Sequence, residues 1–169
     1  MPIKMKGIIE VTMLNVNVTC RQSNQNKNAN EIIRQHDKVY AVLDTNILVS
    51  AIWGASKMSN PTRVLAAVME GKLIPLYNDE ILSEYREVLS RDRFQFDQKL
   101  VDEVLSTIVT CGVYLERTQS DEYAFLDHKD IVFYEVSLSK KNSFLVTGNL
   151  KHFPKESFVI SPSAMVKLL

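Results

Sequence analysis

Short apolar runs alternate with amphipathic stretches from residue 39 onward, and this alternation predicts the order of strands and helices. The runs at 39–43 and 72–78 are short and almost continuously apolar, as is typical of strands buried on both faces. Pro61 and Gly71 bound a helical segment between them, since proline suits a first helical turn and glycine a helix end. The later predicted elements are helices at 79–91, 97–112, 130–141 and 162–169, and strands at 113–117, 142–149 and 158–161.

This order predicts one α/β domain over residues 38–169, because parallel strands need helical crossovers to connect them. The expected architecture is a three-layer α/β/α sandwich with a central, mostly parallel sheet. Ligand sites in such sheets gather at the carboxyl ends of the strands. Polar residues that directly follow a strand are therefore the first candidates for a functional site.

Residues 1–37 form an N-terminal extension with a different pattern. Residues 8–19 alternate between apolar and polar and predict a strand, 21–30 are polar and predict a loop or linker, and 31–38 fit a short helix. Three interpretations stay open: a tail, an arm that pairs with a partner, or a stretch upstream of the natural start.

Composition and charge agree with a soluble globular protein. The chain is 46% hydrophobic, and its 20 basic and 20 acidic residues cancel, so global charge gives no support for nucleic-acid binding but leaves room for a local basic groove. Cys20 and Cys111 lie far apart, outside any metal-ligand spacing, and are expected to be reduced thiols. No apolar run approaches the ~20 residues that span a bilayer, and the N-terminus lacks a signal-peptide core. The expected location is the cytoplasm.

Oxygen-bearing side chains recur where predicted strands end or helices begin. Asp44 directly follows the first strand, and Asn149 ends the strand that contains Val146 and Thr147. Asp130 opens a helix, with Asp127 three residues before it.

Glu84 adds a fifth oxygen donor from within a helix. It lies one turn into the helix at 79–91 and borders that helix's apolar face, whereas Asp79, Glu80 and Glu87 fit the helix start or the solvent. A carboxylate at the edge of a core needs a partner, because burying a lone charge costs several kcal/mol.

Oxygen-only clusters suit hard cations such as Mg²⁺ and Mn²⁺. A bound cation of this kind lowers the pKa of water and holds a phosphate oxygen, as phosphodiester hydrolysis requires. Simpler explanations exist for each residue alone. Asp44 and Asp130 fit helix caps, Glu84 fits a surface acid and Asn149 fits a turn residue.

The segments that carry these residues resemble the PIN-domain family of small α/β nucleases, many of which are toxins of bacterial toxin–antitoxin pairs. VYAVLDTNILVSAIW (39–53) is similar to the family's opening strand and its DTN signature. RVLAAVMEGKLIPLYNDEILSEYREVLSRDRF (63–94) is similar to the next helix, strand and acid-bearing helix. DHKDIVFYEVSLSKKNSFLVTGNLKHF (127–153) is similar to the late acidic turn, helix and strand ending in TGD. The resemblance covers about residues 38–165.

The resemblance implies metal-binding positions for this chain. Asp44, Glu84 and Asp130 match the acids of the family, and Asp127 stands at the preceding acidic position of the late turn. Asn149 departs from the pattern, because it stands where the family usually has a fourth Asp. An amide brings no charge, so we expect weaker metal affinity, and the departure disfavours a two-metal arrangement.

A second departure lies in the turn before Asp130. His128 and Lys129 stand where acids and proline are frequent in relatives. A lysine beside the site would oppose cation binding or help to hold phosphate.

The expected roles follow from these matches. Asp44 and Asp130 would ligate a cation, and Glu84 would ligate through water or act as general base. Supporting hydrogen bonds are expected from Thr45, Asn46, Ser50 and Thr147.

Substrate contacts are expected from four further side chains. Arg63, Lys151 and His152 are candidates for phosphate contact, although a solvated surface is the simpler interpretation. Trp53 is a candidate for stacking on a base, although a tryptophan after an apolar run is more often a packing residue.

The favoured hypothesis is a Mg²⁺- or Mn²⁺-dependent endoribonuclease that acts as a toxin, restrained by an antitoxin protein, with a homodimer as a family habit. The second hypothesis is a degenerate PIN domain that binds RNA or a protein without cutting, which Asn149 and Lys129 favour. The third is a metal-dependent phosphohydrolase of small molecules.

Overall fold

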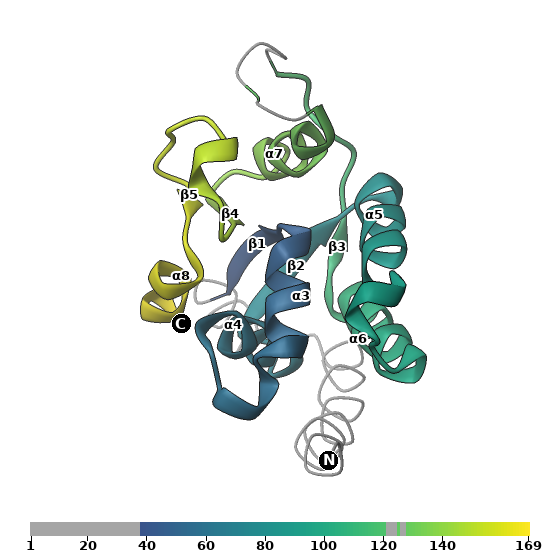
Figure 1. Ribbon diagram of the computed structural model, residues 1–169. Helices are drawn as coiled ribbons and strands as arrows, with labels where there is room; N and C mark the ends of the chain where they lie inside the picture. The colour runs from purple at the N-terminus through teal and green to yellow at the C-terminus, as the bar shows by residue number, and fades with distance from the viewer. Residues whose placement is uncertain (1–37, 121–124, 126–127) are drawn as a thin grey trace, which may run out of the picture.

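The computed structural model describes residues 38–120, 125 and 128–169, which fold around one five-stranded sheet (Figure 1). The predictions for the N-terminal extension fall on residues 1–37, outside the described part of the chain. The strand order is β3-β2-β1-β4-β5, and all four neighbouring pairs are parallel. The strands are β1 (Val39–Leu43), β2 (Leu73–Tyr77), β3 (Val113–Tyr114), β4 (Ser143–Val146) and β5 (Val159–Ile160).

Helices connect the strands in the way that parallel pairing requires. Two helices follow β1, two follow β2, one precedes β4 and one follows β5. Between residues 38 and 169 the described helices are α3 (Thr45–Trp53), α4 (Asn60–Met69), α5 (Asp79–Leu89), α6 (Gln98–Cys111), α7 (Ile131–Leu138) and α8 (Pro162–Leu168). None of these helices is long and apolar enough to cross a membrane.

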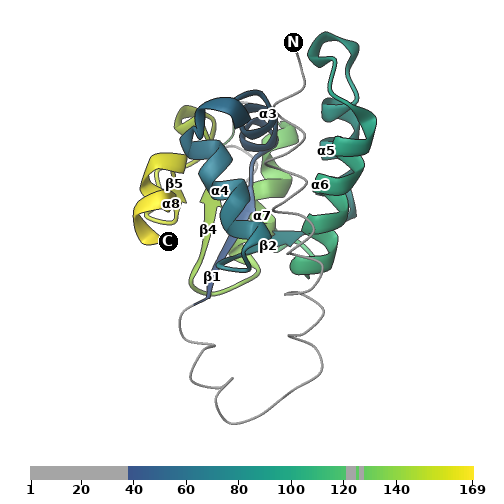
Figure 2. The ribbon, with the colours of Figure 1, turned by 90° about the horizontal axis from the view of Figure 1, so that it is seen from below.

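The helices lie on both sides of the sheet. The connections from β1 to β2 and from β2 to β3 both move the chain toward the same edge of the sheet. Connections between parallel strands are right-handed, so both place their helices, α3–α6, on the same face. The crossover to β4 steps back, and α7 packs on β1, β2 and β4 from the opposite face. Figure 2 shows α3 and α4 together on one side of β1 and β4, with α5 and α6 stacked beside them. The α/β fold expected from the sequence is confirmed.

The central position of β1 explains its apolar sequence. It pairs with β2 on one edge and β4 on the other, and Ala41, Val42 and Leu43 are completely buried. In the pairing with β4, Leu43 lies opposite Val146, so both strands end at the same level of the sheet. The residues that follow these two strands are therefore brought side by side.

Several elements are shorter than the periodicity predicts. The strand expected at 113–117 pairs only at Val113–Tyr114, because the chain then turns toward α7, where the Thr118 N–H donates to the Glu135 carbonyl. The strand expected at 142–149 pairs only over β4.

The helix expected at 130–141 is also shorter, at Ile131–Leu138. It ends early because the Ser143 hydroxyl donates to the carbonyls of Ser137 and Lys140, which satisfies groups that a longer helix would need to bond. Residues 128–130 form a 3₁₀ turn in front of it.

Candidate active site

Asp44 lies at the junction of β1 and α3 and organises the site. It is the N-cap of α3, where its Oδ1 accepts a hydrogen bond from the Asn46 backbone N–H at 3.3 Å. Its Oδ2 accepts two more, from Asn46 Nδ2 and Thr147 Oγ1, each at 2.5 Å. Only 7% of Asp44 is exposed. Asp44 is thus a helix cap, as the simpler interpretation predicts, but the cap accounts for only one of the three hydrogen bonds that its carboxylate accepts.

The end of β4 contributes the second part of the site. Thr147 is fully buried, and its Oγ1 also accepts a hydrogen bond from the Asn149 N–H at 2.9 Å. The Gly148 N–H donates to Asn46 Oδ1 at 3.0 Å, and a Cβ at position 148 would lie only 3.1 Å from that oxygen. The two strand ends are thus joined by hydrogen bonds through Thr147, Gly148 and the side chains of Asp44 and Asn46.

Glu84 reaches this site from α5. The helix begins after β2, where the buried Asn78 side chain caps it by accepting from the Ile81 N–H at 2.9 Å. This start places Glu84 in the second turn, and its Oε1 accepts a hydrogen bond from Thr45 Oγ1 at 3.0 Å. The prediction that Glu84 borders the core is confirmed, since it is half-buried while Asp79, Glu80 and Glu87 are exposed.

Asp130 enters from the start of α7. It stands at the N-cap position but makes no side-chain cap hydrogen bond, so the cap interpretation does not explain its carboxylate. Its Oδ2 lies 2.9 Å from His152 Nδ1, and His152 Nε2 lies 2.6 Å from Asn149 Nδ2. An amide nitrogen can only donate, so Nε2 accepts and Nδ1–H donates to Asp130. His152 therefore connects Asp130 to Asn149.

The three carboxylates interact electrostatically. Burial raises the pKa of Asp44, and the charge of Asp130 raises it further, against the hydrogen bonds from Thr147 and Asn46 that lower it. Burial likewise raises the pKa of Glu84, opposed by the Thr45 hydrogen bond and reinforced by the charge of Asp44. Lys129 acts in the opposite direction on Glu84. The site concentrates negative charge in a partly dehydrated place, as cation-binding sites do.

This electrostatic cluster predicts an unusual pH dependence of stability. Because the pKa of Glu84 is raised in the folded chain, the folded state binds its proton more tightly than the unfolded chain does. Protonated Glu84 therefore stabilises the fold at low pH, and this stabilisation is lost as pH rises through the raised pKa of Glu84. Glutamine does not ionise, so Glu84→Gln should not lose this stabilisation. As pH rises from about 4 to about 7, we expect the free energy of unfolding of Glu84→Gln to increase relative to that of the wild type, in urea titrations without divalent metal.

Glu87 on the same helix is the matched control. The hydrogen bond and charge of Arg91 lower its pKa, so its stabilisation is present at neutral pH and is lost on acidification. Glu87→Gln should therefore show the opposite pH trend. If the stability of both variants relative to the wild type changed with pH in the same direction, the conclusion that the fold raises the pKa of Glu84 would be contradicted.

A family model for the PIN domain matches residues 40–151 of the chain. The chain belongs to the PIN-domain family. This confirms the family expected from the DTN segment and the two segments that follow it. Searches of curated proteins and of solved structures returned no significant match.

PIN domains form a nuclease superfamily whose members act on RNA and typically use divalent metal ions. In this PIN domain the side chains near the ends of β1 and β4 offer carboxylate and amide oxygens, which are the ligands that hard divalent cations prefer. Among the described residues, no three Asp, Glu, His or Cys side chains are arranged so that they could hold one metal ion as they lie. Asp127 lies outside the described part of the chain.

Other residues expected at the site of this PIN domain lie apart from these contacts. Ser50 is exposed on α3, and none of the hydrogen bonds described above involves its hydroxyl. Arg63 is exposed on α4, and Lys151 is exposed in the turn after Asn149. Trp53 is 63% exposed at the end of α3, so it is not a core residue, although its ring contacts Phe94 and Phe96.

Sequence reasoning missed two contacts that support the site. His152 was expected to contact phosphate, but the structure places it between Asp130 and Asn149. The only sequence signal is its position three residues after Asn149. Tyr85 lies on the buried face of α5, and its hydroxyl donates to the Leu43 carbonyl, which fixes α5 against the end of β1. An aromatic residue on an apolar face does not reveal such a bond.

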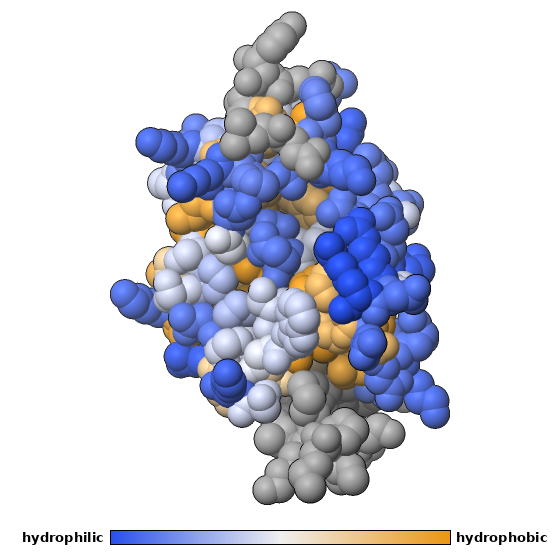
Figure 3. All heavy atoms as spheres, viewed as in Figure 1, coloured by the Kyte–Doolittle hydropathy of each residue, from blue (hydrophilic) through white to orange (hydrophobic). Residues whose placement is uncertain are grey.

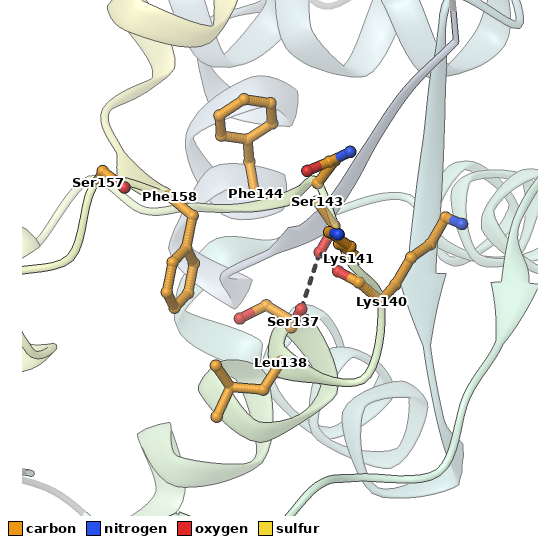
Figure 4. A pocket seen from close by; sticks show the side chains of 9 residues that line it. Ser137, Leu138, Lys140, Lys141, Ser143, Phe144, Ser157 and Phe158 are labelled. Carbon is orange, nitrogen blue, oxygen red and sulfur yellow. Dashed lines mark hydrogen bonds between the residues drawn. The ribbon is translucent and has the colours of Figure 1, made fainter. Parts of the chain in front are cut away.

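A cavity of about 440 Å³ lies away from these carboxylates, at the other end of β4 (Figure 4). Phe144, Phe158 and Lys141 line it together with small polar residues. The Lys140 side chain extends away from Phe158 in Figure 4, and its ammonium lies over the Tyr40 ring. Since the acids and their hydrogen-bond partners gather at the carboxyl ends of β1 and β4, this edge of the sheet, and not the cavity, is the candidate active site.

Proposed function

We propose that this PIN domain is a divalent-metal-dependent endoribonuclease. The observation that carries the proposal is the electrostatic interaction of Asp44 with both Asp130 and Glu84 at the carboxyl edge of the sheet, where burial and neighbouring acids raise the pKa values of Asp44 and Glu84. Two of these acids stand at helix N-caps: Asp130 makes no cap hydrogen bond, and Asp44 accepts two bonds besides its cap.

The residues present fit a hard cation by their chemistry. Asp44 and Asp130 are the proposed ligands, with Glu84 as a third donor, directly or through water, and Asn149 and Asp127 as weaker candidates. A bound Mg²⁺ or Mn²⁺ would supply polarisation of the phosphate and a water of lowered pKa. It would also offset the charge of Asp130, which adds to the effect of burial in raising the pKa of Asp44.

The chain's own residues then have distinct roles. Thr147 and Asn46 orient the Asp44 carboxylate, and Thr45 orients Glu84. A carboxylate whose pKa is raised toward neutrality is a better proton acceptor, so Glu84 suits a general base that takes a proton from attacking water. His152 holds Asp130 in place. Arg63 and Lys151 remain candidates for phosphate contact.

We propose further that the protein acts as the toxin of a toxin–antitoxin pair in the cytoplasm. The resemblance of three segments, in order, to the PIN-domain family, many of whose members are such toxins, supports this role. The antitoxin would cover the acidic site, and a homodimer is the expected assembly.

A second candidate function is RNA or protein binding without cleavage. Asn149 favours it, because the side chain at this strand end is neutral and its amide is engaged with His152. A third candidate is hydrolysis of small phosphoesters, which a panel of RNA and mononucleotide substrates separates from the first.

The test is cleavage of a mixed panel of single-stranded and structured RNAs by the full chain, with Mn²⁺, Mg²⁺ or EDTA. Cleavage that requires metal and is abolished by EDTA supports the nuclease. Absence of cleavage by folded protein under every metal condition would overturn the proposal in favour of the binding module.

Asn149→Asp tests the metal site by a readout other than cleavage. A fourth acid adds negative charge beside Asp44 and Asp130, so we expect Mn²⁺ to bind about tenfold more tightly in isothermal titration calorimetry. Asn142→Asp, at the opposite end of β4, is the control and should leave the affinity unchanged. Mn²⁺ binding by Asn149→Asp that is equal to or weaker than that of the wild type would show that position 149 is not part of the metal site.

A further inference from the structure

Three aromatic side chains from two segments form a cluster outside the proposed catalytic site. The Phe94 and Phe96 rings are stacked, with centroids 5.3 Å apart and an interplanar angle of 8°. Trp53 meets both nearly at right angles, at 5.4 and 6.4 Å. Phe96 packs against the hydrophobic core and anchors the cluster.

The outer part of this cluster is open to solvent. Trp53 exposes 63% of its surface, which is unusual for the largest apolar side chain at the end of a helix. The Arg93 guanidinium lies 4.5 Å from the centre of the Phe94 ring. An exposed indole, a stacked ring pair and a cation are thus held together. Figure 3 shows apolar side chains beside strongly hydrophilic ones on this face, between α3 and α5.

The cluster shares two helices with Asp44 and Glu84. α3 begins with Thr45, which bonds to Glu84, and ends with Trp53. α5 carries Glu84 and leads into the turn that carries Arg93 and Phe94. Trp53 is eight positions after Thr45 along the helix, a rise of about 12 Å at 1.5 Å per residue. That span corresponds to three or four nucleotides of a stacked strand, at about 3.4 Å each.

We propose that Trp53, Phe94 and Arg93 form a base-stacking subsite for single-stranded RNA whose scissile phosphate lies at Asp44. The inference rests on the proposed function. Every base has a π-face, so exposed aromatic rings bind single strands with little sequence preference, and an arginine adds cation–π and phosphate contacts. The cation beside the rings favours a polyanion over an uncharged protein surface as the occupant.

The chain supplies its own probe for this subsite, because Trp53 is its only tryptophan. The full chain is titrated with a single-stranded RNA of mixed sequence, about 12 nucleotides long, in EDTA so that binding is measured without cleavage. We expect quenching of the Trp53 fluorescence. In anisotropy titrations of the same RNA carrying a dye, Trp53→Ala should bind about 5- to 100-fold more weakly. Phe94→Leu should also weaken binding, and it retains the fluorescent reporter.

Leu168→Ala is the control, since Leu168 is an exposed apolar residue on α8, which lies across the molecule from α5 and α6 in Figure 1. It should bind RNA as the wild type does. Thermal unfolding by circular dichroism checks that each variant is folded. RNA binding without quenching, or equal affinity of Trp53→Ala and the wild type, would overturn the subsite.

The same experiment separates this subsite from the nuclease assignment. Quenching and a loss in Trp53→Ala without any RNA cleavage would retain the subsite and refute the nuclease. RNA cleavage without quenching of the Trp53 fluorescence would support the nuclease and refute the subsite. If Trp53→Ala instead changes the elution volume in size-exclusion chromatography and leaves RNA affinity intact, the cluster is an interface between copies of the chain and the RNA subsite is refuted.

Discussion

Asp44→Asn is expected to lower metal-dependent RNA cleavage by at least about 100-fold while the chain stays folded. The substitution removes the negative charge and retains almost the same volume. Asparagine is as good an N-cap as aspartate, so α3 keeps its start. Without the buried charge, stability at neutral pH should be equal to or above that of the wild type. Initial rates on an RNA substrate and thermal unfolding measure the two effects separately.

Asp97→Asn is the matched control for this prediction. Asp97 is also an N-cap aspartate, and its side chain accepts from the Lys99 N–H at the start of α6, but it is exposed. Both variants change a cap in the same way, and only one removes a carboxylate from the site. Asp97→Asn should retain cleavage. Undiminished cleavage by Asp44→Asn would exclude Asp44 from catalysis.

Thr147→Val is expected to lower both stability and activity. Its hydroxyl is fully buried, donates to Asp44 and accepts from the Asn149 N–H, so valine leaves one donor and one acceptor unpaired at unchanged side-chain size. In urea and thermal unfolding experiments, we expect a loss of about 2 kcal/mol in the free energy of unfolding and a fall of about 4–8 °C in the midpoint of thermal unfolding. The pKa of Asp44 should rise further, because the Thr147 hydrogen bond lowers it. Cleavage should fall about 10- to 100-fold, as when other groups that orient a ligand are removed.

Thr107→Val provides the comparison for the loss of a hydroxyl. Thr107 lies on α6, where its hydroxyl donates to the Glu103 carbonyl at 2.8 Å near the surface. Water can replace this bond, so stability should change by less than about 0.5 kcal/mol and cleavage should stay at the wild-type rate. A Thr147→Val variant as stable and active as Thr107→Val would show that the Thr147 hydroxyl is dispensable.

The elements that the sequence predicts well are those with a strong local signal. β1 has the predicted bounds, since five apolar residues end abruptly at Asp44. α5 and α6 agree within two residues, because their periodicity and their caps are encoded locally. The ends of α7 and β4 differ, because a tertiary bond from Ser143 to the carbonyls of α7 decides where the helix stops.

Glu135 shows why some side chains escape prediction. It lies in α7, which is buried along nearly its whole length between the sheet and the segment after β3. Its Oε1 accepts from the N–H and hydroxyl of Ser120, and its Oε2 lies 3.3 Å from Arg117 Nε. An acid in an apolar helix gives no indication of which distant segment will pair with it.

The sequence by itself determined the α/β order, the positions of Asp44, Asp130 and Asn149 at strand ends or helix starts, and that of Glu84 on the edge of a helix, because these follow from local periodicity. Its DTN segment and the two segments that follow it indicated the family. The tertiary structure decided which side chains meet. The parallel pairing of Leu43 with Val146 places Thr147 on Asp44, although 103 residues separate them. It also placed His152 on Asp130 and left Trp53 exposed. Such contacts depend on strand register and helix packing between distant segments, which no local pattern encodes.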